Sequence, residues 1–326
     1  MDVPRTMRAV RIGKVTYGRD VQLAEISVPA VQPGWVLVQV KAFGLNDVER
    51  KMRHGGITRS DARKPIVPGV ECAGVVVDPS DSPFKEGAKV ICCAGGLGTL
   101  FNGTYAEYVL VPSDHVFSVP DDVSWDWIHL AAFPETYLMA WGSLFDSLQL
   151  EPFDLLLIRG ATCGVGYAAI QLAKALGARV VAASNRKEKL PLLKEAGANK
   201  VVLDEGMLFG QVKPADKVLD LVGASTLRDS LRCTAYGSIV CASGTLGGLD
   251  SLGYFDPIRD VPNHVYLTGF LGESPSQELY DEVCEFMVSR KLEPIVNIAY
   301  AFEDIAAALA RQDSGSGGKL VIAVEQ

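Results

Sequence analysis

The stretch that decides the fold reads Leu155-Leu156-Leu157-Ile158-Arg159-Gly160-Ala161-Thr162-Cys163-Gly164-Val165-Gly166. Its opening run of apolar residues is typical of a strand buried on both faces of a parallel sheet. Residues 164–176 then predict a helix, with Gly177 as the stop signal. A tight turn between such a strand and a helix N-terminus offers free N–H groups and a positive dipole end to a phosphate. The stretch therefore predicts a dinucleotide-binding turn, and the alternative is a strand-to-helix turn without a ligand.

Compared with the pattern GxGxxG, the turn keeps only the last glycine, Gly166. Ala161 and Cys163 occupy the other two glycine positions, and Gly164 adds an extra glycine. The middle glycine normally lets the backbone approach the pyrophosphate. We therefore expect Cys163 to push the diphosphate outward or to shift the turn, with the phosphates resting chiefly on the backbone at Gly164-Val165.

Strands and helices alternate on both sides of this turn. Strand candidates are Leu155–Ile158, Arg179–Ala183, Lys200–Leu203, Lys217–Val222, Ser238–Ala242 and Val265–Gly269, and helices are expected near 187–196, 225–233 and 277–291. Six strands with intervening helices predict a doubly wound parallel Rossmann sheet. Residues 1–120 instead contain short runs rich in Val and Ile between Gly, Pro and Asp, which predict a mostly β, barrel-like domain. Residues 294–326 return to β character around a helix near 303–311. The expected fold class is α/β.

Length and composition restrict the class of protein. The 326 residues exceed the size at which a single core usually stops growing, about 250–300 residues. The net charge of −8 argues against a nucleic-acid partner, which needs a basic face. Seven cysteines without a CxxC pair indicate neither a disulfide framework nor a zinc knuckle. No apolar signal region and no run of roughly 18 apolar residues is found, so we expect a cytoplasmic protein without a membrane partner.

The end of the second strand of the predicted Rossmann sheet bears on the choice of cofactor. NAD sites usually place Asp or Glu there, whereas the 2′-phosphate of NADP requires cations. Here the residues are Ser184-Asn185-Arg186-Lys187-Glu188-Lys189, with no acid at the strand end. Charge-assisted bonds from Arg186 or Lys187 could hold a phosphate, so NADP(H) is favoured. The alternative is a solvated helix start.

Short motifs occur in a fixed order along nearly the whole chain: Gly44-Leu45-Asn46, then residues 68–76, 84–90, 103–108 and 171–178, and finally Gly318-Lys319. In this order they resemble the medium-chain dehydrogenase/reductase superfamily and, within it, the quinone oxidoreductase branch. The resemblance implies a GroES-like catalytic domain formed by both chain ends, 1–121 and 269–326, and a Rossmann domain at 122–268. It also implies a homodimer joined through the last strand of the Rossmann domain.

The resemblance also bears on zinc. Zinc-dependent relatives carry a Cys where this chain has Asn46, a His where it has Val70, and a second Cys near Glu135. The four-cysteine structural zinc lobe is absent as well. Glu71 and Glu135 do not supply the three protein ligands expected of catalytic zinc, so no metal site is expected.

The implied catalytic residues are Asn46, Glu49 and Glu135. The Asn46 amide would orient the substrate by hydrogen bonding, or else Asn46 only forms a turn. Glu49 matches an acidic position near the same site, or is an exposed acid at a helix start. Glu135 would be a proton donor if burial raised its pKa, or else a hydrogen-bonded structural acid.

The cofactor residues implied by the turn and the resemblance are Asn46, Met139, Ala161, Cys163, Gly164, Val165, Ser184, Asn185, Arg186, Lys189, Val222, Ser243, Gly244, Phe270, Leu271 and Lys319. Two positions depart from the family pattern. Asp204 replaces a tyrosine at the adenine end, which counts against NADP, and Ile57 stands where an aromatic residue is expected.

The sequence thus predicts an NADPH-dependent, zinc-free oxidoreductase that transfers hydride to a quinone or an α,β-unsaturated carbonyl compound. The alternatives are an enoyl-thioester reductase acting on acyl-CoA or acyl-carrier substrates, and a cofactor-binding member without turnover. In each case the expected partner is a small molecule.

Overall fold

The computed structural model of the chain describes residues 3–13, 15–55, 65–248, 251–272, 275–315 and 318–324. The chain forms two compact units. Unit 1 comprises Met1–Glu135 and Ser274–Gln326, and unit 2 comprises Thr136–Glu273. Both chain ends therefore contribute to the same unit, as the predicted split catalytic domain requires.

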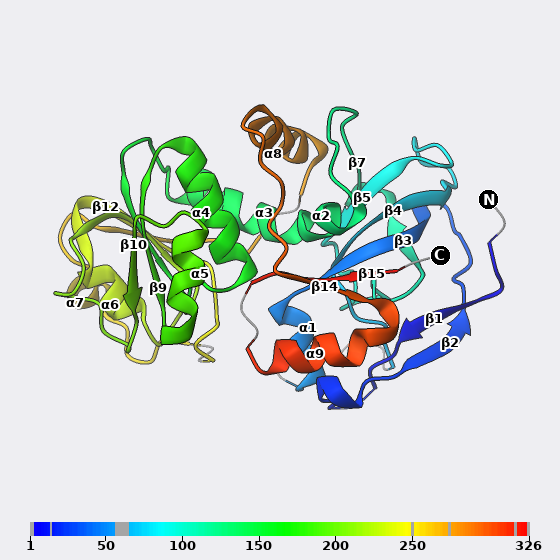
Figure 1. Ribbon diagram of the computed structural model, residues 1–326, viewed down its shortest axis with the longest axis horizontal. Helices are drawn as coiled ribbons and strands as arrows, with labels where there is room; N and C mark the ends of the chain where they lie inside the picture. Colours follow the sequence, from blue (N-terminus) through cyan, green and yellow to red (C-terminus); the bar gives the residue numbers. More distant parts are fainter. Residues whose placement is uncertain are drawn as a thin grey trace. The chain divides into compact units, whose positions relative to one another are not determined.

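Unit 2 is built on a six-stranded parallel sheet with the order β10-β9-β8-β11-β12-β13 (Figure 1). Its strands are β8 (Leu155–Arg159), β9 (Arg179–Ser184), β10 (Lys200–Leu203), β11 (Ala215–Asp220), β12 (Thr234–Ala242) and β13 (Tyr266–Gly269). Because β8 and β11 are neighbours in the middle of the sheet, the chain starts at the centre and winds outward in both directions. This order confirms the doubly wound fold predicted from the six strand candidates.

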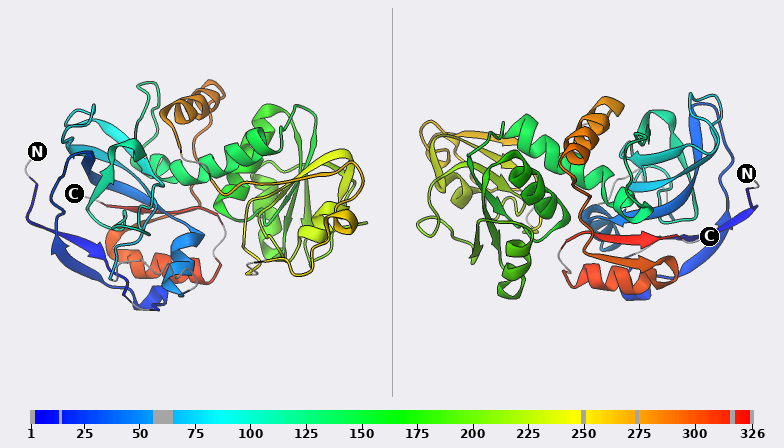
Figure 2. Two further views of the ribbon diagram at one scale, coloured as in Figure 1. Left: turned by 180° about the vertical axis from the view of Figure 1, so that it is seen from behind. Right: turned by 45° about the horizontal axis from the view of Figure 1, so that its top comes forward.

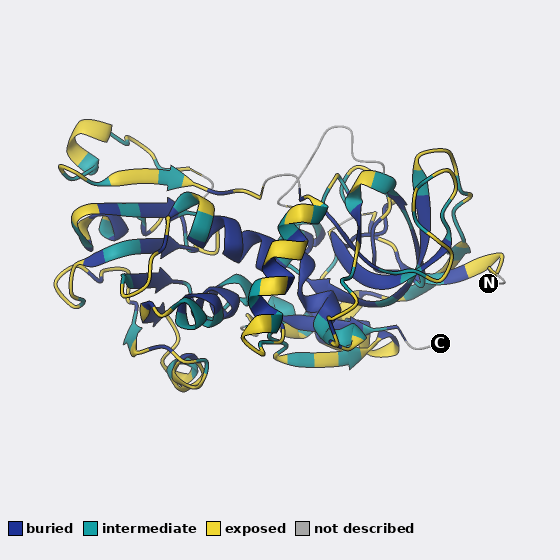
Figure 3. Cartoon of the chain, turned by 90° about the horizontal axis from the view of Figure 1, so that it is seen from above, coloured by how far each residue is buried: buried dark blue, intermediate teal, exposed yellow. Residues whose placement is uncertain are grey.

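Helices flank this sheet (Figure 2). They are α4 (Gly164–Leu176), α5 (Leu190–Glu195) and α6 (Leu227–Arg232). The unit also contains α7 (Pro257–Asp260) and most of α3 (Pro134–Trp141), which continues into a π-helical turn at Gly142–Ser147. The helix predicted for about 164–176 is confirmed, with Gly177 as its left-handed C-cap. The central strands are buried, whereas the edge strand β13 is largely exposed (Figure 3).

Unit 1 contains a mostly antiparallel seven-stranded sheet. Its strands are β3 (Trp35–Leu45), β4 (Glu71–Asp78), β5 (Lys89–Cys93), β6 (Tyr108–Pro112), β7 (Val116–Ser118), β14 (Ile298–Ala301) and β15 (Leu320–Ala323). The C-terminal strand β15 pairs with β3, so hydrogen bonds join the C-terminal segment of the chain to its N-terminal segment. A separate hairpin pairs β1 (Thr6–Val10) with β2 (Leu23–Ser27). The helices of the unit are α1 (Asp47–Arg53), α2 (Trp127–Ala132), α8 (Gln277–Ser289) and α9 (Ile305–Asp313).

The unit boundaries differ from the predicted ones at 122 and 268. Residues 122–135 belong to unit 1, because α2 packs against β3, β4 and β15 and because Trp125 Nε1 donates to the Leu292 carbonyl at 3.2 Å. Residues 269–273 belong to unit 2, where Phe270 N donates to the Ala242 carbonyl at 3.2 Å. The change from β to alternating pattern near residue 122 therefore precedes the physical boundary.

Candidate functional site

A buried ion pair between Glu71 and Lys319 forms the centre of the polar interior of unit 1. The side chain of Glu71 is fully buried and that of Lys319 is 2% exposed, and Lys319 Nζ donates to Glu71 Oε1. Asn46 bridges the two groups: its Nδ2 donates to Glu71 Oε1 at 2.8 Å, and its Oδ1 accepts from Lys319 Nζ at 2.7 Å. Two of the predicted residues, Asn46 and Lys319, thus lie together, with Glu71 between them.

The strands that carry these residues explain why they meet. Glu71 is the first residue of β4, Lys319 immediately precedes β15, and Asn46 follows β3, which pairs with both strands. A glycine is required at position 44 of β3, because a Cβ there would lie 2.2 Å from Glu71 Oε1 and 2.7 Å from Lys319 Nζ. In the motif Gly44-Leu45-Asn46, the glycine therefore leaves space for the ion pair, and the Asn46 side chain forms hydrogen bonds with both of its members.

Glu49 caps the start of α1 from inside the protein. Its Oε2 accepts from Asn46 N at 3.0 Å, and its Oε1 accepts from Val70 N at 3.1 Å. The residue is fully buried, so the expectation of an exposed helix-start acid is wrong. Burial raises the pKa of the Glu49 carboxyl from 4.5 to about 8, against the opposing effect of the backbone hydrogen bonds. Glu49 therefore fixes the backbone of Asn46 and of Val70.

Glu135 adjoins the same cluster through its backbone, since Glu135 N donates to Glu71 Oε2 at 2.8 Å. Its half-buried carboxylate accepts from the Cys93 thiol at 3.5 Å. Burial first, and the charge of Glu71 second, raise the pKa of Glu135. Among the titratable groups around Glu71, Glu135 thus combines partial exposure with a raised pKa.

A second buried ion pair anchors Asn46 from the other side. Arg53, at the end of α1, is fully buried, and its Nη2 lies 2.8 Å from Asp313 Oδ1 at the end of α9. The neighbouring Gln312 accepts from Arg53 Nη2 at 3.0 Å and donates to the Asn46 carbonyl at 2.8 Å. The start and the end of α1 are therefore both tied to buried partners, which restricts the movement of Asn46.

In unit 2, the predicted phosphate-binding turn lies between β8 and α4. Cys163 is the N-cap of α4 in an extended conformation, φ −97° and ψ 170°, and its Sγ accepts from Gly166 N at 3.4 Å. The left-handed residue of the turn is Gly160, with φ 72°, so the first glycine of the pattern is displaced by one position from Ala161. No residue in the described ranges accepts from the N–H groups of Gly164 and Val165, which are the groups expected to hold the phosphates.

The turn also passes close to the helix that it starts. A Cβ at position 166 would lie 2.4 Å from the Ala161 carbonyl oxygen, so only glycine allows this approach. The open N–H groups, the tight backbone and the positive end of a 13-residue helix fit the diphosphate of a dinucleotide.

The other predicted cofactor residues follow the carboxyl ends of the parallel strands, which share one edge of the sheet. Ser184 is the last residue of β9 and is followed by Asn185, Arg186 and Lys189; Val222 follows β11, Ser243 and Gly244 follow β12, and Phe270 and Leu271 follow β13. Met139, in α3, lies beside Gly272, and Lys319 belongs to unit 1. The predicted cofactor residues of unit 2 other than Met139 therefore lie at or after the carboxyl ends of strands of one sheet, whereas Asn46 and Lys319 belong to unit 1.

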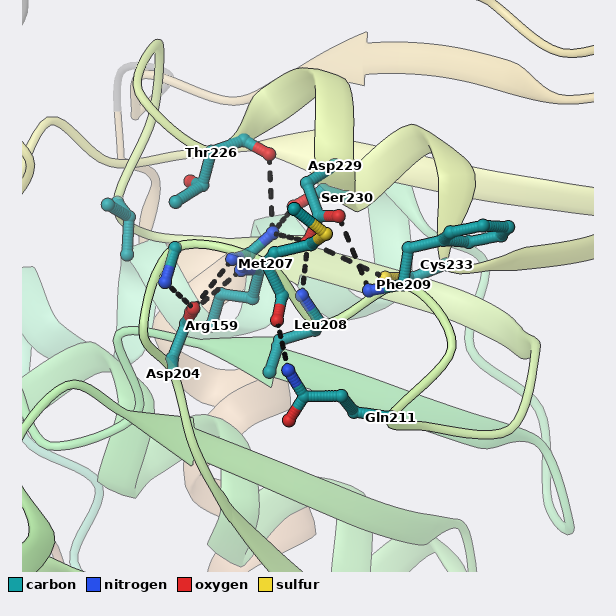
Figure 4. A network of polar contacts seen from close by, with 12 residues as sticks. Arg159, Asp204, Met207, Leu208, Phe209, Gln211, Thr226, Asp229, Ser230 and Cys233 are labelled. Atoms are coloured by element: carbon teal, nitrogen blue, oxygen red, sulfur yellow. Dashed lines mark hydrogen bonds and ion pairs between the residues drawn. The ribbon is translucent and has the colours of Figure 1, made fainter.

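Asp204, which in the sequence counts against NADP, is paired with a buried cation in the structure. Its carboxylate is paired with Arg159 Nε at 2.9 Å and Nη2 at 2.7 Å, and it also accepts from Gly206 N at 3.0 Å (Figure 4). Sequence reasoning missed Arg159 as a functional candidate, although a charged residue that ends an apolar strand was a usable signal. Ile57, the other departure from the family pattern, lies outside the described residues.

Comparison with known proteins assigns the chain to a family. Residues 32–121 match the family described as alcohol dehydrogenase GroES-like domain, and residues 164–289 match the family described as zinc-binding dehydrogenase. The chain is also 26% identical to the quinone oxidoreductase of Mus musculus over 338 residues, with 98% of each chain covered. The chain belongs to the medium-chain dehydrogenase/reductase superfamily. Within this superfamily it is a member of the quinone oxidoreductase-like branch.

Solved structures of the superfamily share the fold. The quinone oxidoreductase from Coxiella burnetii superposes with a TM-score of 0.84 at 24% identity, covering 98% of this chain and 100% of that one. A thermostable alcohol dehydrogenase from Pyrobaculum aerophilum gives a TM-score of 0.83 at 26% identity, with the same coverage. Membership of this superfamily makes the chain an oxidoreductase with a nicotinamide dinucleotide cofactor and a small-molecule substrate.

Two further observations concern metals and membranes. Within the described ranges, no three His, Cys, Asp or Glu side chains are grouped so that they could hold a metal ion. None of the helices in that part of the chain has the length and apolar character needed to cross a membrane.

Proposed function

We propose that this chain is an NADPH-dependent oxidoreductase that works without zinc and transfers hydride to a quinone or an α,β-unsaturated carbonyl compound. The observation that carries the proposal is the cluster of Asn46, Glu71 and Lys319. A buried ammonium group already balances the Glu71 carboxylate, and the amide of Asn46 is bonded to both groups at a position where zinc-dependent relatives have a cysteine. The three positions that match zinc ligands in relatives hold Asn46, Val70 and Glu135. Their side chains offer one carboxylate and neither an imidazole nor a thiolate ligand.

The choice of acceptor follows from this cluster. Without a strong Lewis acid to polarise a carbonyl group, an acceptor that itself delocalises the charge created by hydride transfer, such as a quinone or an enone, is favoured. Bound NADPH would supply the hydride. The Asn46 amide retains one N–H and one lone pair beyond its bonds to Glu71 and Lys319, and we assign to these the orientation of the substrate.

Glu135 is our candidate proton donor, and the alternative role is that of a structural acid. Its raised pKa increases the protonated fraction of the carboxyl group, as a proton donor requires, and the residue as a whole is partly exposed. Glu49, whose oxygens both accept backbone hydrogen bonds, acts as a positioning residue for Asn46.

The preference for NADPH rests on the residues after β9. Asn185, Arg186 and Lys187 are exposed there, and Ser184 Oγ accepts from Arg186 N at 3.2 Å, which fixes the start of this segment. Exposed cations at the end of the second strand are suited to a 2′-phosphate.

We also propose that the protein is a cytoplasmic homodimer. The seven cysteines are all free, as expected in a reducing compartment. The edge strand β13 presents Tyr266 and Leu267, which are 65% and 38% exposed, beside the fully exposed Leu271. An open sheet edge with apolar side chains is suited to pairing with a second copy.

The experiment that tests this function measures NADPH and NADH oxidation against a panel of quinones, enones and enoyl thioesters, with metal analysis of the purified protein. We expect turnover of quinones or enones, preference for NADPH and no stoichiometric zinc. Turnover confined to enoyl thioesters would establish the enoyl-thioester reductase instead. Tight NADPH binding without any turnover would make the chain a cofactor-binding member.

A further inference from the structure

A buried network of charges centred on Arg159 lies directly before the phosphate-binding turn. The Arg159 side chain is fully buried and makes a bidentate ion pair with Asp204. Its remaining nitrogen, Nη1, lies 2.8 Å from Asp229 Oδ2 and donates to Ser230 Oγ at 3.2 Å and to the Thr226 carbonyl at 3.3 Å (Figure 4). One guanidinium therefore joins the ends of β8 and β10 to the start of α6.

Two carboxylates, those of Asp204 and Asp229, form ion pairs with this one cation, and both also accept backbone hydrogen bonds. Asp229 accepts from the backbone N–H groups of Leu208 and Phe209 at 2.6 and 3.3 Å, which holds the loop after β10. Asp204 accepts from Gly206 N at the beginning of the same loop. Without Arg159, both carboxylates would remain close to their backbone donors but would lose their ion pair with the guanidinium.

The network adjoins the residues proposed to bind the 2′-phosphate. Asp204 N donates to the Ser184 carbonyl at 2.8 Å, and the side chain of Ser184 in turn accepts from Arg186 N. Arg159 itself pairs in register with Ala183, one residue before Ser184. The backbone of Asp204 is thus bonded to Ser184, the residue directly before the exposed segment Asn185-Arg186.

We propose that Arg159 is a selectivity-determining positioning residue, whose charge offsets part of the negative charge of Asp204 and Asp229 and which holds both carboxylates in a buried network next to the segment proposed to bind the 2′-phosphate of the cofactor. The inference rests on the proposed use of NADPH. Asp204 departs from the family pattern in a way that should oppose a phosphate, and Arg159 supplies the compensation within the same chain. The loop and the charge balance at this end of the site are therefore controlled by one side chain that has no need to touch the cofactor.

Charge compensation and mechanical support make different predictions for the two cofactors. NADPH and NADH differ only at the 2′ position. Loss of the geometry of the loop after β10, to which no contact with the 2′-phosphate is assigned, therefore weakens both to a similar extent. An uncompensated carboxylate near that position weakens NADPH selectively, because only NADPH carries the additional negative charge. The ratio of the two dissociation constants therefore separates the two roles.

The test measures the dissociation constants of NADPH and NADH for the purified full chain by isothermal titration calorimetry. For Arg159→Met we expect the ratio of the NADH constant to the NADPH constant to fall about tenfold, as charge effects at short range allow. The double variant Arg159→Met, Asp204→Asn should recover part of that loss. Arg228→Met is the matched control: Arg228 lies on α6 next to Asp229, is paired with Asp260 at 3.1 Å and is half-exposed, so its ratio should stay within about twofold of the wild type.

Asp204→Asn keeps the inference testable if Arg159→Met does not fold, because Arg159 retains Asp229 in that variant. We expect Asp204→Asn to tighten NADPH about threefold and to leave NADH unchanged. Equal changes for both cofactors in Asp204→Asn and in Arg159→Met would overturn the inference and leave Arg159 a structural role only. Failure of the proposed NADPH preference would instead be seen in the wild type, as equal binding of NADPH and NADH.

Discussion

At the scale of single residues, Lys319 determines the charge balance in the interior of unit 1. Glu71 is fully buried and cannot be hydrated when its partner is removed. We therefore expect Lys319→Met to lower the free energy of unfolding by about 3–5 kcal/mol, the cost of leaving one partner of a buried ion pair alone. Chemical denaturation measures this loss.

The control for Lys319→Met is Lys51→Met. Lys51 lies 3.1 Å from Asp47 in a partly exposed i,i+4 pair, with side chains 27% and 32% exposed. Such pairs contribute about 0.3–0.5 kcal/mol, so this variant should remain close to the wild type. Equal losses for the two variants would contradict the role assigned to Lys319.

Glu49 gives the protein a predictable dependence on pH. The folded protein holds the proton on this carboxyl up to a pKa of about 8, whereas the ordinary value is 4.5. Because the folded state binds more protons than the unfolded chain in this window, stability falls as the pH rises through it. We expect Glu49→Gln to reduce this fall by an amount on the order of a few kcal/mol, measured as the difference in unfolding free energy between about pH 5 and pH 8.

Glu25→Gln is the matched control for this measurement, since Glu25 is exposed on β2. Its pH dependence should follow that of the wild type. If Glu49→Gln shows the same pH dependence as the wild type, the buried carboxyl does not hold its proton in the folded state.

At the scale of elements, the turn before α4 depends on close contact between backbone segments. Gly166→Ala would place a methyl group 2.4 Å from the Ala161 carbonyl oxygen, which forces the turn and the helix apart. We expect a loss of about 1–3 kcal/mol in stability and at least tenfold weaker binding of NADPH, because the phosphate-binding N–H groups move. Calorimetry on the purified variant measures both quantities.

Gly253→Ala is a suitable control in the same unit, because a Cβ at position 253 would meet nothing within 4 Å. It should leave both quantities unchanged. Unchanged cofactor binding in Gly166→Ala would show that the phosphates do not rest on this turn.

At the scale of the whole molecule, the proposed dimer requires the edge of the parallel sheet. A charge on β13 should oppose pairing of two apolar edges. We expect Leu267→Asp to convert a dimer of about twice 35.0 kDa into a monomer, as measured by light scattering coupled to size-exclusion chromatography. Leu192→Asp on α5 is the control, because Leu192 is 44% exposed against 38% for Leu267. A monomeric wild type would contradict the proposed dimer.

The agreement between predicted and observed bounds differs from one helix or strand to another. The helix at 164–176 and the strand at 200–203 lie where they were predicted, because local apolar patterns and the glycine stop define them. The helix expected at 187–196 instead begins as a 3-10 turn at Lys187–Lys189 and becomes α-helical only at Leu190, with Pro191 in its first turn. Within an α-helix, proline is tolerated only in the first turn. Pro191 therefore indicates a later start of the α-helix than the predicted residue 187.

The sequence by itself determined the doubly wound sheet, the strand-to-helix turn before α4 and the residues that follow the carboxyl ends of the strands. Each of these follows from local periodicity and from the rule that parallel strands end at one edge. Only the tertiary structure decided the charge pairing: Glu71 with Lys319, 248 positions apart, and Arg159 with Asp204 and Asp229. The physical reason is that a buried charge is stabilised by whatever partner the fold brings within a few ångströms, and spacing along the chain carries no record of that partner.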